Sequence, residues 1–269
     1  MIKKYILLPF QEILLNFIRF SKMHQFENFF DVIYVLSLDR CKDRRKHITT
    51  LFENNNIEFY KFFNATDYTE SYIQEIKNNG LIDIKNKHKC IRCDKEKCNC
   101  LLPRDKLLDT EIANWLSYIS IFNEIKTKKI KKALIMEDDI VFTPNGISIM
   151  NDFFKDNCYE SNKIDSNKPV LIRIGSGFNK NIHEPNNKKI RLDKTFRMSN
   201  PCFFVNNHFV NLFLDNCFPI SFTSDMFIHK KLIDLNPTAD IQHFSIIPSP
   251  IYELSWGSKK NMKSLIRDI

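Results

Sequence analysis

The chain has 269 residues, of which 43% are hydrophobic and only 5 are glycine. A chain of this length and apolar content can bury a sizeable core, so a disordered protein is excluded and a globular one is expected. Lys and Arg total 40 against 32 for Asp and Glu, and the resulting net charge of +8 favours anionic partners such as nucleotides, nucleic acid or acidic membrane surfaces. No G-x-G-x-x-G or G-x-x-x-x-G-K stretch occurs, which excludes the common glycine-rich phosphate loops.

Segment 1–30 predicts an amphipathic helix rather than a membrane span. Gln11, Glu12 and Asn16 interrupt its apolar run well short of the ~20 residues that a span needs. We expect this helix either to pack on the domain or to make a peripheral contact with a membrane or a partner. Because no cleavable signal is evident, a cytoplasmic location is expected, with the eight cysteines as thiols or metal ligands.

Strands and helices alternate from residue 31 onwards. Strands are predicted at 31–40, 57–66, 132–142, 169–177 and 244–253, helices at 43–56, 71–80, 109–129 and 224–236, and a strand that runs into a helix at 202–216. Gly80 closes the second helix and Asp109 is the expected N-cap of the third. Such alternation is typical of a parallel sheet with crossover helices. We therefore predict a single α/β domain over 31–269, with a mostly parallel central sheet, flanking helices and a cysteine-rich insertion at 81–105.

Three consecutive carboxylates follow an apolar run in "ALIMEDDIVF", residues 133–142. On an extended backbone, Glu137 and Asp139 lie on one face and Asp138 on the other, so two carboxylates can converge on one cation. Hard oxygen ligands suit Mn²⁺ or Mg²⁺. An ion held in this way keeps positions open for the oxygens of a departing diphosphate. The alternative is a solvated strand end that binds no metal.

The stretch "HKCIRCDKEKCNC" contains a C-x2-C-x4-C-x-C array formed by Cys90, Cys93, Cys98 and Cys100. Four thiolates this close in sequence predict a structural Zn²⁺ site, with His88 as a substitute ligand. Free thiols and disulfides are the two alternatives.

Seven pieces of the chain, in order, resemble glycosyltransferase family 25. They are "IYVLSLDRCKDRRKHI", "FYKFFNATD", "EIANWLSYISIFNEI", "ALIMEDDIVF", "NPCFFVNNHFVNLFLDN", "SDMFIHKKL" and "IIPSPIYELSWGSKKNMKSLI". This family includes galactosyltransferases of lipopolysaccharide biosynthesis and those that modify collagen hydroxylysine. Sequences of this family usually have Gly before "EI" and Ser-His in the central helix, where this chain has Thr110 and Ser117-Tyr118.

The resemblance implies a GT-A type, Rossmann-like nucleotide-sugar transferase fold. It makes the acidic triplet the counterpart of the D-x-D metal site, with Glu137 and Asp139 as Mn²⁺ ligands. The residues that it implies for donor binding are Asp39, Arg40, Arg44, Arg45 and Asp138. An Asp can accept from uracil or ribose, and Arg offers forked donors to phosphate, although Arg44 and Arg45 would also fit as exposed helix charges.

The implied reaction moves a hexose, galactose by family default, from a UDP-sugar to a hydroxyl of a glycan, lipid-linked or protein acceptor, with inversion. Inversion needs a base for the acceptor proton, and Asp225 matches the acidic position of the family there. A carboxylate that only complements a helix dipole is the alternative for Asp225.

Two further functions compete with sugar transfer. A basic nucleic-acid-binding protein with a zinc knuckle would use the positive charge and the cysteines, although the acids would repel its phosphates. A metal-dependent nuclease or phosphatase would need more carboxylates or histidines beside the triplet than the sequence places there.

Overall fold

A computed structural model describes residues 25–70, 72–84, 88–100, 105–155, 158–177, 190–194 and 199–255, together with 262 and 265. The predicted N-terminal helix lies outside the described residues up to residue 24, and only α2 (Gln25–Phe29) falls within them. In the described part of the chain, no helix is both long and apolar enough to cross a bilayer.

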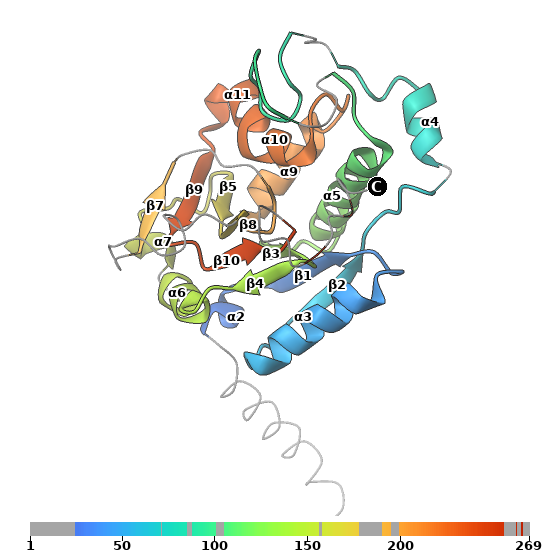
Figure 1. The fold of residues 1–269 in the computed structure, drawn as a ribbon. Coiled ribbons are helices and arrows are strands. Elements are labelled where there is room, and N and C mark those ends of the chain that lie inside the picture. Colours follow the sequence, from blue (N-terminus) through green and yellow to red (C-terminus); the bar gives the residue numbers. More distant parts are fainter. Residues whose placement is uncertain are drawn as a thin grey trace, which may run out of the picture.

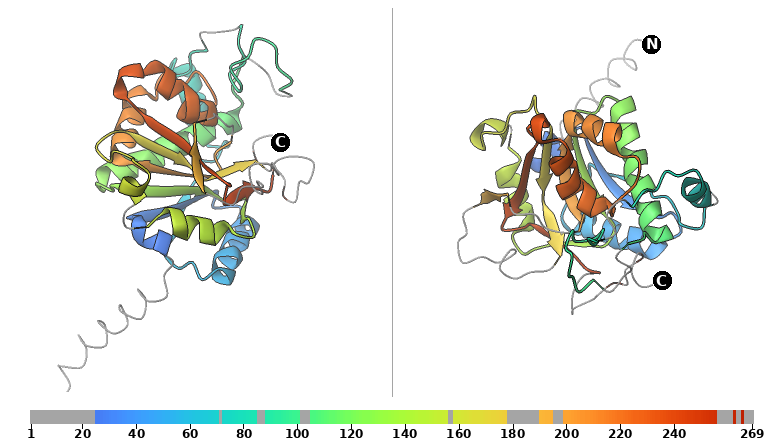
Figure 2. Two further views of the ribbon diagram at one scale, coloured as in Figure 1. Left: turned by 90° about the vertical axis from the view of Figure 1, so that its left-hand side faces the viewer. Right: turned by 90° about the horizontal axis from the view of Figure 1, so that it is seen from above.

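The described residues form an α/β fold with helices on both faces of a central sheet (Figures 1 and 2). The strands of the central sheet are β1 (Val32–Ser37), β2 (Lys61–Asn64), β3 (Lys132–Glu137), β5 (Val170–Arg173), β7 (Arg191–Asp193), β8 (Cys202–Asn206) and β9 (Gln242–Ile247). The helices are α3 (Lys42–Asn54), α4 (Tyr72–Asn78), α5 (Asp109–Thr127), α6 (Gly146–Phe153), α7 (Cys158–Ser161), α9 (Asn207–Asn216), α10 (Ser224–Met226), the π-helical turn η1 (Phe227–Lys231), α11 (Leu232–Leu235) and the 3₁₀ turn η2 (Pro237–Ala239).

The central sheet is mixed, which corrects the prediction of a mostly parallel one. Its order is β2-β1-β3-β8-β5-β9-β7, and β8 pairs antiparallel with both β3 and β5. β7 also runs antiparallel to β9, while the pairs β1–β2, β1–β3 and β5–β9 are parallel. An apolar run predicts that a strand is buried but carries no sign of its direction, so the sequence pattern could not reveal the reversed β8.

The alternating side chains of the inner strands divide between two cores. In β1, Tyr34 and Leu36 face the core formed with α5 and α9, whereas Ile33 and Val35 face the core formed with α2, α3 and α6. The same two-residue period runs through β3 and β8. Because both faces are covered, all six residues of β1 are buried, which explains the continuous apolar run in the sequence.

A second, three-stranded sheet has the order β4-β10-β6 and comprises β4 (Ile140–Phe142), β6 (Gly175–Gly177) and β10 (Ile251–Glu253). The final strand predicted at 244–253 is therefore two strands, β9 and β10, that belong to different sheets. Pro248 and Pro250 lack the N–H group that a continuous ladder needs, so the chain leaves one sheet before it enters the other.

The helix α5 begins one residue earlier than its predicted cap suggests. Its N-cap is Leu108, not Asp109, and the Glu111 carboxylate accepts a hydrogen bond of 2.8 Å from the Leu108 N–H. The Asp109 side chain instead accepts from Lys77 at 2.5 Å, which links α5 to α4. The end of α4 agrees with the prediction, because Gly80 follows it with a φ of +68°.

Candidate active site

A cavity of about 720 Å³ lies where the carboxyl ends of β1, β2 and β3 meet the starts of α5 and α10. The segments just after these strands line it, including Ser37, Thr66 and the acidic triplet. The insertion contributes residues 92–100 to another wall, and the end of β10 contributes Glu253. The edge beyond the carboxyl ends of parallel strands is the usual ligand site of α/β sheets, because the loops converge there.

The acidic triplet departs from the extended geometry that the sequence predicts. β3 ends at Glu137, and Asp138 and Asp139 form the turn that leads into β4. As a result all three carboxylates line the cavity, and Asp138 does not point away from it. Asp138 accepts hydrogen bonds from the Ser37 hydroxyl at 2.6 Å and from Arg44 at 2.5 Å.

Asp139 is buried and Glu137 is partly buried, and nearby carboxylates raise the pKa of both. Burial, followed by the charges of Asp139 and Glu253, raises the pKa of Glu137 well above its ordinary value. Burial and the charge of Glu253 raise the pKa of Asp139 from 3.8 to about 7, although Arg44, 3.7 Å away, opposes this shift. Oδ1 of Asp139 is buried without a hydrogen-bond partner among the described residues. A bound cation would satisfy this oxygen and relieve the repulsion.

The structure separates the four residues predicted for the nucleotide edge into two pairs. Arg40 and Arg44 line the cavity, whereas Asp39 and Arg45 are absent from its lining. Arg40 pairs with Asp67, and the Arg44 side chain is largely buried against Asp138. Arg44 is therefore not an exposed helix charge.

Asp39 and Arg45 form an ion pair of 3.2 Å beside the cavity. Arg45 also donates to the Ser37 carbonyl at 3.1 Å and to the Asn64 side chain at 2.5 Å, so its guanidinium ties the ends of β1 and β2 together. Asp39 is exposed and also accepts from Lys42 at 2.9 Å. These contacts give Arg45 a structural role and leave Asp39 open to solvent.

Asp225 lies in α10 and lines the cavity opposite the strand ends. One carboxylate oxygen accepts from the Ser199 N–H at 3.1 Å, and the other accepts from the Met226 N–H at 2.9 Å. These two backbone donors orient the carboxylate without neutralising it, which suits a group that takes a proton.

Three further site residues were missed by the sequence-based prediction. Glu253 is buried and accepts from the Ser255 hydroxyl at 2.6 Å, and both residues line the cavity. The Tyr118 hydroxyl, in α5, donates to Glu137 at 3.0 Å. An acid at the end of a predicted strand, as Glu253 is in "FSIIPSPIYE", was an available signal. Tyr118 had none, because an aromatic residue on an apolar helix face fits the core equally well.

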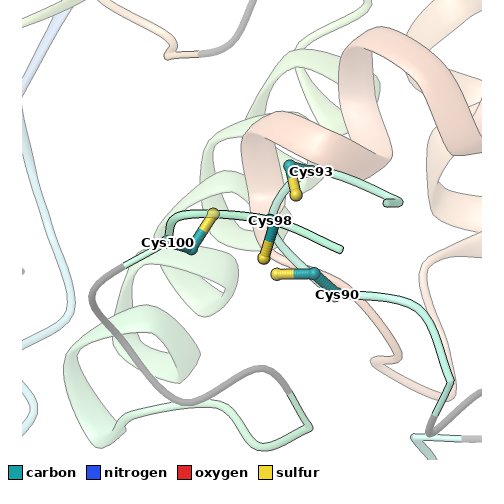
Figure 3. Close-up of side chains that lie close together, drawn as sticks. All are labelled: Cys90, Cys93, Cys98 and Cys100. Carbon is teal, nitrogen blue, oxygen red and sulfur yellow. The ribbon is translucent and has the colours of Figure 1, made fainter. Parts of the chain in front are cut away.

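The four cysteines of the insertion come together beside the cavity (Figure 3). Their sulfur atoms all lie within 4.8 Å of one another. Among the described residues, they are the only group of three or more His, Cys, Asp or Glu with ligand atoms that close, so the acids form no closed cage of three. The cysteine group is thus a candidate metal site distinct from the carboxylates.

No curated protein matches this chain. One solved structure, that of a glycosyltransferase involved in the glycosylation of the major capsid of PBCV-1, is 8% identical with a TM-score of 0.36 over 85% of this chain and 95% of its own. The sequence profile of glycosyltransferase family 25, described as an LPS biosynthesis protein, matches residues 30–213. That match spans more than half of the chain, which therefore belongs to glycosyltransferase family 25.

Proposed function

We propose that this chain transfers a hexose, galactose by family default, from a UDP-sugar to a hydroxyl group of a glycan, lipid-linked or protein acceptor. The single observation that carries the proposal is the cavity at the strand ends, where paired acids, arginines and a separate carboxylate meet. The GT-A type of the fold, the divalent ion and inversion at the anomeric carbon are parts of the same proposal.

Glu137 and Asp139 would hold Mn²⁺ or Mg²⁺, which supplies positive charge to the departing diphosphate. Their donor set fits a hard cation, because both are carboxylates that line the cavity and other carboxylates raise the pKa of each. Asp138 keeps Arg44 against the triplet through a 2.5 Å ion pair. Arg44 and Arg40 then offer guanidinium donors to the diphosphate oxygens from the β1 side of the cavity.

Asp225 would take the proton of the acceptor hydroxyl as its oxygen attacks the anomeric carbon. It faces the cavity from α10, whereas the triplet faces it from β3. This separation supports inversion, because the attacking oxygen has to approach the sugar from the side opposite the diphosphate. As the new glycosidic bond forms, the bond between the anomeric carbon and the diphosphate breaks, the UDP would leave with its electrons and the acceptor proton would pass to Asp225.

The deciding experiment compares Asp139→Asn with Asp152→Asn, a matched change at an exposed carboxylate of α6. A thermal-shift panel of UDP-galactose, UDP-glucose and UDP-N-acetylhexosamines, with and without Mn²⁺, should show the largest stabilisation of the wild type when sugar and metal are both present. Asp139→Asn should lose this stabilisation and at least ten-fold in Mn²⁺-dependent hydrolysis of the UDP-sugar, whereas Asp152→Asn should keep both. Unchanged hydrolysis in Asp139→Asn would refute the proposed metal site.

A further inference from the structure

The cysteine insertion contains a four-thiol site that sugar transfer does not use. All eight cysteines are free thiols, and Cys90, Cys93, Cys98 and Cys100 bring their sulfurs within 4.8 Å of one another (Figure 3). In a tetrahedral zinc tetrathiolate with Zn–S bonds of ~2.3 Å, neighbouring sulfurs are ~3.8 Å apart. A small contraction would therefore complete the coordination, and soft thiolates favour Zn²⁺ over the hard cations that suit the carboxylates.

The backbone already closes around the first two cysteines. The Cys90 carbonyl accepts from the Asp94 N–H at 2.8 Å, and the Cys90 N–H donates to the Lys95 carbonyl at 3.0 Å. The segment 88–100 contains one aliphatic residue, Ile91, so hydrophobic burial contributes little to its order. A metal that four ligands share can supply the missing stabilisation in such a segment.

Residues next to Cys90 and Cys93 make the contacts that join the insertion to the rest of the site. The Ile91 carbonyl accepts from the Thr223 N–H at 3.3 Å, and Arg92 forms a buried ion pair with Glu111 of α5 at 2.5 Å. Asp94 pairs with Lys230 and Lys231 of η1, each at 2.7 Å. Fixing the two cysteines consequently fixes the backbone that touches α5, η1 and the residue before α10.

We propose that the four cysteines bind one structural Zn²⁺ ion, and that this ion fixes the cavity wall that positions Asp225. Thr223, held by Ile91, is the N-cap of α10, and Asp225 is two residues further along. Four thiolates leave the ion no open coordination position, so it stabilises the wall and does no chemistry. The proposal that the cysteines bind zinc does not depend on sugar transfer. The proposal that zinc helps Asp225 to act on the acceptor rests on the proposed function.

Metal content tests the ion directly. Protein purified under reducing conditions should contain close to one zinc per chain by elemental analysis, and Cys98→Ser should lose most of it. Cys217→Ser is the matched control, because Cys217 is not part of the four-cysteine group and its thiol donates to the Leu214 carbonyl at 3.3 Å, a bond that a hydroxyl can keep.

If Cys98→Ser fails to fold, Co²⁺ added to the metal-depleted wild type should give the thiolate charge-transfer absorption of a tetrahedral site. Absence of both zinc and that absorption, iron in place of zinc, or disulfides among the four cysteines would overturn the site.

Hydrogen exchange tests the positioning role without an acceptor. Removing zinc from the wild type, with Mn²⁺ kept in the buffer, should raise amide exchange over 219–231 at least ten-fold while exchange in β1 and α3 stays the same. Unchanged exchange over 219–231 would overturn the positioning role. Mn²⁺-dependent hydrolysis of UDP-galactose by the zinc-loaded protein is measured in parallel. Its absence would count against the proposed function and leave the zinc result standing.

Discussion

At the scale of single residues, hydrogen-bond donors and cationic side chains next to the carboxylates of the cavity stabilise their charges. Glu137 accepts from the Tyr118 hydroxyl, and Asp138 accepts from Ser37 and from the buried Arg44. Asp139 has a weaker set, with Arg44 3.7 Å away and one oxygen that lacks a hydrogen-bond partner among the described residues. Asp139 therefore keeps a buried carboxylate oxygen without a hydrogen-bond partner among the described residues, and a bound cation would stabilise its charge.

The weak stabilisation of the ionised Asp139 carboxylate predicts that the metal-free protein loses stability as the pH rises. The pKa of Asp139 is about 7 in the folded state, against an ordinary value of 3.8 that we take for the unfolded chain. The folded state thus holds the proton of Asp139 more tightly than the unfolded chain does. The contribution of Asp139 to the free energy of unfolding is therefore fully present below about pH 4 and is lost as the pH rises through 7. At ~1.4 kcal/mol per pKa unit, the loss amounts to a few kcal/mol at most.

Urea unfolding at pH 5 and pH 8, with and without Mn²⁺, measures this effect. The free energy of unfolding should fall between the two pH values without metal, and Mn²⁺ should remove the fall because it replaces the proton. Asp139→Asn should flatten the metal-free dependence, whereas the surface variant Asp152→Asn should retain it. A pH dependence that persists in full in Asp139→Asn would show that another group causes it.

Individual residues show how much of the candidate site could be predicted from the sequence. The positions of Glu137, Asp139 and Asp225 at one cavity follow from local patterns, since strand ends and helix starts converge in α/β folds. The roles of Arg44 and Arg45 could not be separated in this way. They are adjacent in α3, and only the three-dimensional packing directs Arg44 to Asp138 and Arg45 to Asn64. Whether they bind a nucleotide stays a prediction.

At the scale of elements, α5 links the acids to the insertion. It carries Tyr118, which faces Glu137, and Glu111, which faces Arg92 of the insertion. The Glu111 carboxylate also accepts from the Leu108 N–H at the start of the helix. One carboxylate therefore satisfies both the helix terminus and a guanidinium that is itself buried.

Arg92→Met should accordingly destabilise the protein by about 3–5 kcal/mol, because it leaves the Glu111 charge buried without its main partner. The loss should appear as a lower midpoint in urea unfolding. Lys168→Met, which breaks an exposed pair between Lys168 and Asp240, should leave the midpoint unchanged. Equal effects of the two variants would contradict the structural importance that we assign to the buried pair.

At the scale of the whole molecule, the cysteine insertion lines the same cavity as the acidic triplet, which argues against a separate nucleic-acid-binding module. The insertion docks through Arg92 on α5, which carries cavity residues, and through Asp94 on η1, and it lines the same cavity as the acidic triplet. Carboxylates at that position would repel a nucleic-acid backbone.

The strand order also predicts that the described fold unfolds as one unit. β8 inserts between β3 and β5, and β9 continues the sheet beyond the end of the family match at residue 213. β10 then brings Glu253 back to the cavity. Both halves of the sequence thus contribute to one sheet and one site. Far-ultraviolet circular dichroism and the fluorescence of tryptophan, including the buried Trp115, should therefore report one coincident urea transition.

A chain that ends at Leu235 tests the same point more severely. It lacks β9 and β10, so β5 keeps only β8 as a partner, β7 loses the strand it pairs with, the second sheet loses its middle strand, and Glu253 is gone. We expect this chain to show no cooperative transition and no stabilisation by Mn²⁺. Leu235→Ala in the full chain is the control, because Leu235 is 61% exposed and its loss should change neither property. Cooperative unfolding of the shortened chain, or two separate transitions in the full one, would mean that the strands after residue 235 are an addition to the fold rather than part of its core.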